Sequence, residues 1–443
     1  MHFRVLLALS FVSALTCGQD WTRFRGPGGL GLASGATIPA SFGADDLNWK
    51  IKLPGKGHSS PLVWKDRVFV TCEGAESGKR LVVCIDAKSG SVVWKRERGF
   101  SVHPQHRFNS VASATPAVDA DRIYLLWTSG DTLVAAALNH DGKQLWKRDV
   151  GPFSAQHGSG ISPVVVGDVV VIGNDNEKKP SFLMGLDRAT GATRWKRERE
   201  SSRASYATPL VRRVGKRVEV IFASTSHGVT SLDPKTGALQ WETGPVFTER
   251  CVGAPAIADG VLFACAGTGG GGRESLAIEL PVGKSTMKPK KLYTVRRSLS
   301  YVPGPIGVGK RFFMFSDGGI VTCLHARSGE RVWRERLDGA FYCSPICIGD
   351  RLYAVSRSGE LFVISTGDTF KLLGRVDLGE RSSATPAVAN GVLYLRTERH
   401  LLSVGGKPDC LGDRGAFRSL RTAHGPRSAP PCGCGPGCER VGE

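Results

Sequence analysis

The sequence lacks a long hydrophobic run outside its N-terminus, because no later segment approaches about 18 consecutive apolar residues. A helix needs about 20 such residues to cross a bilayer, so no later segment is expected to span a membrane. Methionine is also scarce, with 4 residues in 443, whereas glycine and proline number 56 and 24. This composition predicts a globular chain interrupted by many turns and argues against a helical one.

Acidic residues are fewer than basic ones. The chain has 40 Asp and Glu against 59 Lys and Arg, which gives a formal net charge of +19 and favours acidic partners. The basic residues are scattered along the whole chain, and no nucleic-acid-binding motif is present. Nucleic acid is therefore not expected as a partner.

Residues 1–18 have the pattern of a secretory signal peptide. Arg4 precedes an apolar stretch over residues 5–15, and small residues follow it. The chain is therefore expected to be exported, to the periplasm or the medium. Cys17 suggests a lipid anchor, but Thr16 and Ala14 fit a lipoprotein cleavage site poorly, so export without a lipid is favoured.

A short motif, a small residue followed by proline, recurs eight times at steps of 40 to 55 residues. After each proline come a few apolar residues, a polar or glycine turn and a β-rich run, which together predict a hairpin. The eight copies are Ser60-Pro61, Thr115-Pro116, Ser162-Pro163, Thr208-Pro209, Ala254-Pro255, Gly304-Pro305, Ser344-Pro345 and Thr385-Pro386.

Most repeats continue with an Asp or Asn turn that ends in glycine, and then with a strand that carries an aromatic residue. The acidic or amide side chain caps the turn, the glycine takes a positive φ, and the ring is predicted to pack between neighbouring units. These expected docking positions are Trp49, Trp94, Trp146, Trp195, Trp241, Tyr293 and Trp333. The seventh repeat has Leu373 and Gly374 there, so its docking contact should be weaker.

Four short strands per repeat predict an all-β fold, an eight-bladed β-propeller of four-stranded blades. The eighth repeat stops early, and residues 47–53 have the form of its missing fourth strand. This N-terminal strand is expected to close the ring and remove an open sheet edge. The predicted organisation is a signal peptide (1–18), a lead segment (19–46), the propeller (47–406) and a disordered basic tail (407–443) rich in Cys, Gly and Pro.

The repeated segments, the small-Pro strand starts and the closing strand resemble the pyrroloquinoline-quinone-like (PQQ-like) repeat family over about residues 21–404. The resemblance implies membership of one of two branches of this superfamily, one enzymatic and one non-enzymatic. Quinoprotein alcohol and glucose dehydrogenases hold the quinone in the central funnel. Non-enzymatic propellers include the lipoprotein of the outer-membrane β-barrel assembly machinery, whose single-propeller type this chain resembles.

The resemblance implies further features for a quinone enzyme, namely an adjacent cysteine pair, a Trp under the quinone and Glu, Asn and Asp ligands for Ca²⁺. No Cys-Cys dipeptide occurs, and no ligand set can be placed by motif. No catalytic, cofactor-binding or metal-binding residue is therefore assigned. The favoured interpretation is a non-catalytic, monomeric binding scaffold for a protein or an extracellular polymer. The alternative is a diverged PQQ- and Ca²⁺-dependent oxidoreductase of alcohols or sugars.

Loops just before the small-Pro motifs are expected to open near one mouth of the central funnel. Their polar side chains would suit an acidic or hydroxyl-rich ligand, but the favoured interpretation is that they are solvated loop residues or hydrogen-bond partners of unpaired strand ends. The candidate rim residues are His58, His106, Arg107, Asn109, His157, Arg203, Tyr206, Arg250, Tyr301, Tyr342 and Arg381.

Several other features are expected to be structural. His103 and His106 lack a third metal ligand of fitting spacing. The run 269–272 lacks the Lys-Ser/Thr of a phosphate-binding loop and is predicted to be a flexible insertion. Cysteine pairs 72/84 and 251/265 leave disulfides open, and the tail cysteines 410, 432, 434 and 438 leave a soft-metal site open.

Overall fold

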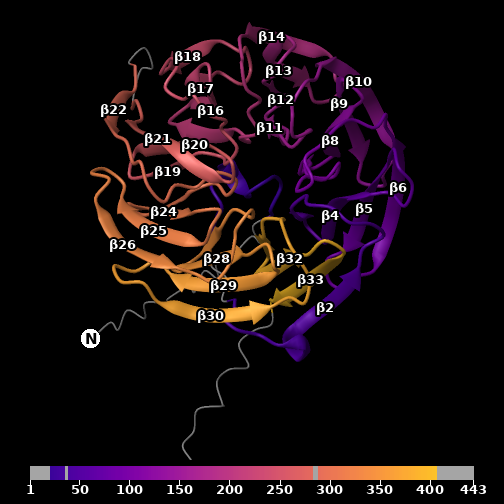
Figure 1. Ribbon diagram of the computed structural model, residues 1–443. Coiled ribbons are helices and arrows are strands. Elements are labelled where there is room, and N and C mark those ends of the chain that lie inside the picture. Colours follow the sequence, from indigo (N-terminus) through magenta and orange to yellow (C-terminus); the bar gives the residue numbers. More distant parts are fainter. Residues whose placement is uncertain (1–19, 35–37, 283–287, 407–443) are drawn as a thin grey trace, which may run out of the picture. The chain divides into compact units, whose positions relative to one another are not determined.

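The computed structural model describes residues 20–34, 38–282 and 288–406. The predicted signal peptide (1–18), Cys17 and the predicted tail (407–443) lie outside the described residues. Within them, the strands form eight sheets arranged radially around a centre, as an eight-bladed propeller (Figure 1). The predicted fold class is confirmed.

Each blade has four antiparallel strands, and the sheet of blade 7 has a fifth strand, β1 (Leu32–Ala33), beside β27 (Ile346–Ile348). Blade 1 consists of β3 (Leu62–Trp64), β4 (Arg67–Glu73), β5 (Lys79–Asp86) and β6 (Val92–Gly99), and blade 2 of β7 (Ala117–Val118), β8 (Arg122–Ser129), β9 (Thr132–Asn139) and β10 (Gln144–Pro152). Blade 3 consists of β11 (Val164–Val166), β12 (Val169–Asn174), β13 (Ser181–Asp187) and β14 (Thr193–Arg199), and blade 4 of β15 (Leu210–Val214), β16 (Arg217–Ser224), β17 (Gly228–Leu232) and β18 (Leu239–Glu242).

Blades 5 to 8 repeat this plan, and the last is completed by a strand from the N-terminal part. Blade 5 consists of β19 (Ala256–Ala258), β20 (Val261–Thr268), β21 (Gly271–Glu279) and β22 (Lys290–Tyr293), and blade 6 of β23 (Ile306–Val308), β24 (Arg311–Phe315), β25 (Ile320–His325) and β26 (Arg331–Arg336). Blade 7 contains β27 (Ile346–Ile348), β28 (Arg351–Val355), β29 (Glu360–Ser365) and β30 (Leu372–Asp377), and blade 8 consists of β31 (Ala387–Ala389), β32 (Val392–Arg396), β33 (His400–Gly405) and β2 (Leu47–Lys52).

The ring closes through β2, which pairs antiparallel with β33. Lys50 lies opposite Leu402, and Lys52 lies opposite His400. The predicted closing strand is therefore confirmed, one residue shorter than expected. Because β2 covers the outer edge of β33, the first and last parts of the chain share one sheet, and no blade is left incomplete.

The docking aromatic residues fasten each blade to the next. In five blades the indole N–H donates to a carbonyl in the turn of the following blade, at 2.8 to 3.1 Å. These bonds join Trp49 to Ala87, Trp94 to His140, Trp146 to Arg188, Trp195 to Pro234 and Trp333 to Gly367. The turn glycine must be small as well as left-handed: a Cβ on Gly191, at φ 71°, would lie 2.7 Å from the Trp146 ring.

Two docking positions differ from the other five in chemistry. The Tyr293 hydroxyl of blade 5 donates to the Ala326 carbonyl at 2.7 Å, so a phenol replaces the indole. Trp241 of blade 4 instead donates to Glu219 in its own blade, at 3.4 Å.

Blade 7 replaces its docking ring with main chain. Gly374 occupies the position of the ring, opposite Val363, and a Cβ there would lie 1.8 Å from the Ala40 carbonyl oxygen. The lead segment therefore fills the space that a Trp fills elsewhere. Its Ile38 carbonyl accepts hydrogen bonds from Arg351 and from Tyr353, at 3.2 and 2.9 Å.

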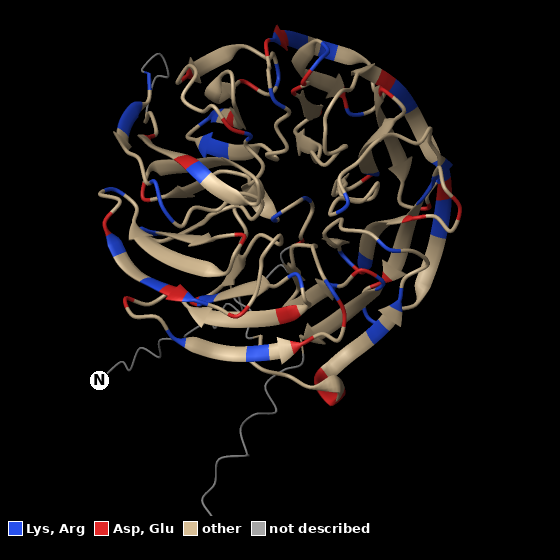
Figure 2. Ribbon diagram, in the orientation of Figure 1, with Lys and Arg blue, Asp and Glu red and all other residues tan. Residues whose placement is uncertain are grey.

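Lys and Arg side chains are spread around the ring. Figure 2 shows them on outer strands such as β6, β14 and β26, interspersed with acidic residues. The helices of the described residues are two 3-10 turns, η1 (Pro27–Gly29) and η2 (Ala44–Asp46), and neither is long or apolar enough to pass through a bilayer.

The structure also tests the predicted insertion over 269–272 and the two cysteine pairs. The predicted insertion over 269–272 is wrong, because these residues form the turn of the β20–β21 hairpin and the start of β21. The cysteine pairs 72/84 and 251/265 are not bonded, since all seven cysteines within the described residues are buried free thiols.

Candidate functional site

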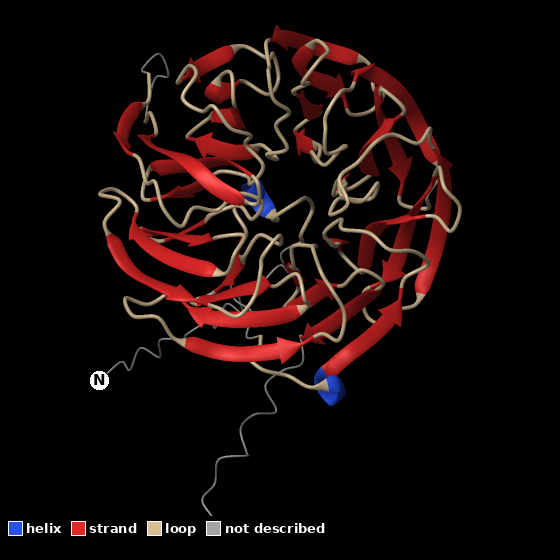
Figure 3. Ribbon diagram, viewed as in Figure 1, coloured by secondary structure: helices blue, strands red, loops and turns tan. Residues whose placement is uncertain are grey.

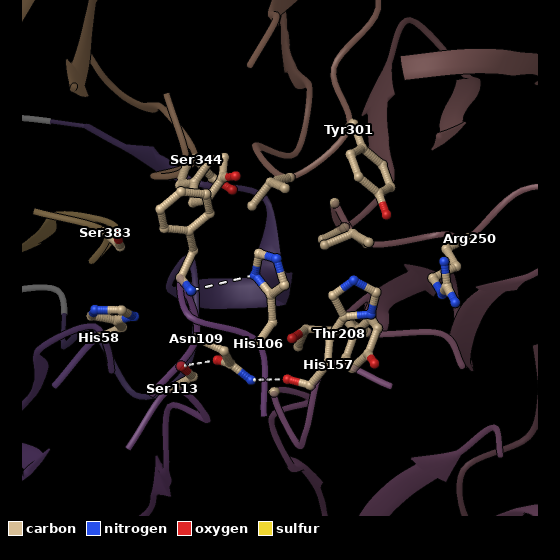
Figure 4. A pocket seen from close by; sticks show the side chains of 18 of the residues that line it. His58, His106, Asn109, Ser113, His157, Thr208, Arg250, Tyr301, Ser344 and Ser383 are labelled. Atoms are coloured by element: carbon tan, nitrogen blue, oxygen red, sulfur yellow. Dashed lines mark hydrogen bonds between the residues drawn. The ribbon is translucent and has the colours of Figure 1, made fainter. Parts of the chain in front are cut away.

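A cavity of about 570 Å³ opens at the centre of the ring (Figure 4). Its volume lies within the range of about 300–1,000 Å³ of pockets that hold a small ligand. Its wall comes from loops before the inner strands of several blades, together with Phe24 of the lead segment. The lining residues are Phe24, His58, Ser60, His106, Phe108, Asn109, Ser113, Thr115, Gln156, His157, Gly160, Ser162, Tyr206, Thr208, Arg250, Val252, Gly253, Ala254, Thr268, Gly269, Gly270, Tyr301, Val302, Tyr342, Ser344, Ser383 and Thr385.

The structure brings eight of the eleven candidate rim residues into this wall. They are His58, His106, Asn109, His157, Tyr206, Arg250, Tyr301 and Tyr342. The other three do not line the cavity. Arg107 is exposed with its guanidinium 4.6 Å from the Phe108 ring, Arg203 lies 3.8 Å from Glu249, and Arg381 is exposed.

The lead segment forms the floor. Trp21 is fully buried and exchanges two main-chain hydrogen bonds with Val63 of blade 1, each 2.9 Å long. Arg23 donates to the Pro209 carbonyl of blade 4, and Arg25 donates to the Pro305 carbonyl of blade 6 at 2.8 Å. The helix η1 therefore lies at the centre of the ring (Figure 3).

After the centre, the segment runs outward to blade 7, where β1 (Leu32–Ala33) pairs parallel with β27. One short stretch thus contacts blades on opposite sides of the ring. The side chain of Phe24, between the two arginines, faces the cavity.

A belt of hydroxyl groups links neighbouring blades around the cavity. At four of the blade junctions, the residue before the proline donates its backbone N–H to the hydroxyl of its counterpart in the next blade. The bonds run from Ser60 to Thr115, from Thr115 to Ser162, from Gly304 to Ser344 and from Ser344 to Thr385, at 2.9 to 3.0 Å. These contacts give a physical reason for the repeated small residue.

In blade 6 the residue before the proline is a glycine without a hydroxyl, and the structure gives a reason for it. Gly304 stands where most blades have Ser or Thr, and a Cβ there would lie 2.9 Å from an Arg25 guanidinium nitrogen. The side chain of Arg25 therefore needs the space that a hydroxyl residue would take.

Asn109 fixes one side of the mouth. Its amide nitrogen donates to the His157 carbonyl at 2.7 Å and to the Ser159 carbonyl at 3.1 Å, while Ser113 donates to its amide oxygen (Figure 4). The rings of His106 and His157 therefore lie together, with centroids 5.1 Å apart.

Burial, together with nearby positive charge, favours neutral imidazoles in the wall. Burial, together with the charge of Arg396, lowers the pKa of His58 to about 4. Burial and the charge of Arg250 also lower the pKa of His157. Arg250 itself is held by Glu177 at 2.8 Å and by Gln156 at 2.9 Å.

An aromatic and cationic cluster lies beside His106, whose ring centroid is 5.3 Å from that of Phe108. The Arg357 guanidinium lies 4.1 Å from the Phe108 ring centre and 4.5 Å from that of Tyr342. Such geometry is a cation–π contact. No carboxylate within the described residues lies within 4.0 Å of Arg357.

The donor set does not fit a quinone held by Ca²⁺. A Ca²⁺ ion takes six to eight oxygen ligands, carboxylates among them. The residues that line this cavity include no Asp, Glu or Cys. Across the described residues, no group of three or more His, Cys, Asp or Glu side chains is placed to hold a metal ion, which includes His103 and His106. The tail cysteines lie outside the described residues.

Sequence reasoning missed the floor and the belt. Phe24 lies in the lead segment, which no repeat pattern assigns to the funnel. The hydroxyl residues were visible as strand starts, but their inward position depends on how eight blades meet. Phe108 and Gln156 carry no sequence signal beyond their place in the loops.

Comparison with known proteins shows likeness in sequence and fold. A curated relative, the outer membrane protein assembly factor BamB of Yersinia pestis, is 23% identical over 286 residues, which are 59% of this chain and 66% of the relative's length. The match thus spans just under two thirds of that relative.

Solved structures share the fold. The BamB of Moraxella catarrhalis matches with a TM-score of 0.59 and 18% identity, over 80% of this chain and 95% of that one. A quinohemoprotein alcohol dehydrogenase of Comamonas testosteroni matches with a TM-score of 0.61 and 13% identity, over 88% and 81%.

The family model of the outer membrane protein assembly factor BamB matches residues 40–212, 79–290 and 281–407. Because these matches cover far more than half of the chain, the protein belongs to the BamB family of PQQ-like β-propellers.

Proposed function

We propose that the chain is an exported, non-catalytic binding propeller whose ligand, part of a protein or an extracellular polymer, enters the central cavity. One observation carries this proposal: the cavity is floored by the chain's own N-terminal segment and lined by hydrogen-bonding side chains without a carboxylate or thiol. Such a wall can bind, but it offers no set of groups suited to hold Ca²⁺ or to act as a carboxylate base.

The family supports a role in the cell envelope. The curated relative is named for assembly of outer-membrane proteins, and the N-terminal sequence of this chain has the pattern of a secretory signal. A periplasmic or secreted, monomeric protein is therefore proposed, without a lipid on Cys17.

The alternative is a quinone-dependent oxidoreductase, and the likeness to the Comamonas enzyme favours only the shared fold. The test uses purified full chain with PQQ, Ca²⁺ and a panel of alcohols and sugars. We expect no reduction of an artificial electron acceptor and no change in the quinone absorbance on titration. Turnover above a protein-free control would overturn the proposal.

A blocking variant links binding to the cavity. Gly160 lines the wall with space for a side chain, since a Cβ there meets its nearest neighbour, Tyr206, at 3.6 Å. Gly160→Leu should fold normally and lose ligand binding, whereas Gly99→Ala, at a position with nothing within 4 Å, should keep it.

A further inference from the structure

The hydroxyl belt presents donors to the cavity. The oxygens of Thr115, Ser162, Ser344 and Thr385 each accept a backbone N–H from the neighbouring blade. A hydroxyl has one hydrogen to donate, and no described residue accepts it from any of these four. The belt therefore offers O–H groups to whatever fills the cavity.

Two buried polar atoms in the wall also lack a partner. Neither the Tyr206 hydroxyl nor Nδ1 of His157 makes a hydrogen bond of normal geometry to a described residue. Leaving a buried polar group unpaired costs about 1–3 kcal/mol, so a shift of either side chain that brings the atom to a ligand in the cavity would recover that energy. Burial also raises the pKa of Tyr206, so its hydroxyl keeps its proton.

The charged side chain in the cavity wall is a cation. The wall contains Arg250, which is paired with Glu177 outside the lining, and it contains no Asp or Glu. Behind the floor, Arg23 and Arg25 flank Phe24, both buried, and no carboxylate within the described part of the chain lies within 4.0 Å of either. Their guanidinium Nε and Nη1 atoms also make no hydrogen bond there. Buried, uncompensated cations favour an anion in the nearby cavity.

From these three observations we propose that the cavity binds an acidic saccharide, a short hydroxyl-rich chain that carries carboxylate or sulfate groups. The inference rests on the proposed function and names the ligand class of the same site. Oxyanions accept hydrogen bonds from the belt, from Tyr206 and from Arg250, and charge-assisted bonds are the stronger ones.

The aromatic residues favour a saccharide over an acidic peptide. Phe24 and Tyr301 present rings along the wall, on which the C–H face of a sugar ring can pack, whereas Arg357 covers the rings of Phe108 and Tyr342. The ring of hydroxyls also matches a ligand with many hydroxyl groups.

The experiment measures affinity by calorimetry for four probes: trigalacturonate, its methyl ester, a sulfated heparin tetrasaccharide and pentaglutamate. We expect micromolar-range binding of at least one acidic saccharide, and at least tenfold weaker binding of the ester. Binding of trigalacturonate alone identifies carboxylate as the oxyanion, and binding of the heparin fragment alone identifies sulfate.

Three variants test whether the probe binds in the cavity. Tyr206→Phe removes one unpaired donor and should weaken binding about tenfold. Gly160→Leu should abolish binding. Arg197→Gln, which removes an exposed charge on the outer strand β14, should leave it unchanged and so controls for the net charge of +19.

Four results would overturn the inference: equal binding of acid and ester, tighter binding of pentaglutamate, no binding of either acidic saccharide, or equal loss in Arg197→Gln. None of these four results overturns the proposed function, which fails on quinone-dependent turnover. The two failures are thereby distinguishable.

Discussion

At the scale of single residues, the chain uses a few buried ionic groups to join its blades. Glu219 is fully buried in blade 4, 2.9 Å from both Arg212 and Arg217, and it also accepts a bond from Trp241. Arg212 reaches on to the Pro281 carbonyl of blade 5 at 3.0 Å. This ion cluster takes the place of the indole contact that other blades make with the next turn.

Glu219→Gln should destabilise the protein by about 3–5 kcal/mol, because it leaves two partly buried arginines without their carboxylate. Urea unfolding followed by tryptophan fluorescence measures the change. Glu198→Gln, in an exposed pair with Lys196 at 3.4 Å, should change stability by less than about 1 kcal/mol. Equal effects of the two substitutions would show that the buried cluster contributes no more than a surface pair.

Asp317 should make stability depend on pH. Its carboxylate accepts the backbone N–H groups of Tyr301 and Val302, at 3.1 and 3.3 Å, and so positions two residues of the cavity wall. Burial raises the pKa of Asp317 to about 6, from 3.8. A raised carboxyl pKa gives stability that is present below the unfolded value and lost as the pH rises through the folded one.

We therefore expect the wild type to lose about 2–3 kcal/mol relative to Asp317→Asn between pH 4 and pH 7. Urea midpoints at several pH values provide the measurement. A constant difference between the two proteins over this range would contradict the assignment.

At the scale of elements, the lead segment contributes to the cavity floor and to blade 7 before it reaches blade 8. It crosses the floor, adds β1 to blade 7 and fills the missing docking position beside Gly374, before it becomes β2. The weakness expected in blade 7 from its missing Trp is offset in this way, because main chain occupies the groove.

Gly374→Ala should displace residues 38–42, since the added methyl would meet the Ala40 carbonyl. We expect faster proteolytic cleavage near that segment and a lower melting temperature. Gly99→Ala, in β6 with open space around it, is the matched control and should behave like the wild type. Unchanged cleavage in Gly374→Ala would show that the segment does not depend on this contact.

At the scale of the whole molecule, closure of the ring depends on one strand. A chain that starts at residue 54 lacks β2 and the floor, and it exposes the outer edge of β33. Unpaired edges promote association, so this protein should be oligomeric or aggregated in size-exclusion chromatography with light scattering. A chain that starts at residue 19 should be monomeric, and a monomeric, fully folded truncation would contradict the role of β2.

The sequence by itself determined the propeller, its blade count and its closing strand. These follow from local patterns, in which a small-Pro start, an Asp or Asn turn with glycine and an aromatic ring recur within each repeat. Each part acts over a few residues, so each can be recognised one repeat at a time.

Only the tertiary structure decided the cavity. Its floor joins Arg25 to Pro305, 280 residues away, and its belt joins hydroxyls that lie about 40 to 55 residues apart. Eight of eleven candidate rim residues meet there, yet three arginines do not, because solvent or a nearby partner holds them outside. Which donors face inward, and which cations lack a partner, depends on how eight similar blades pack around a segment that resembles none of them.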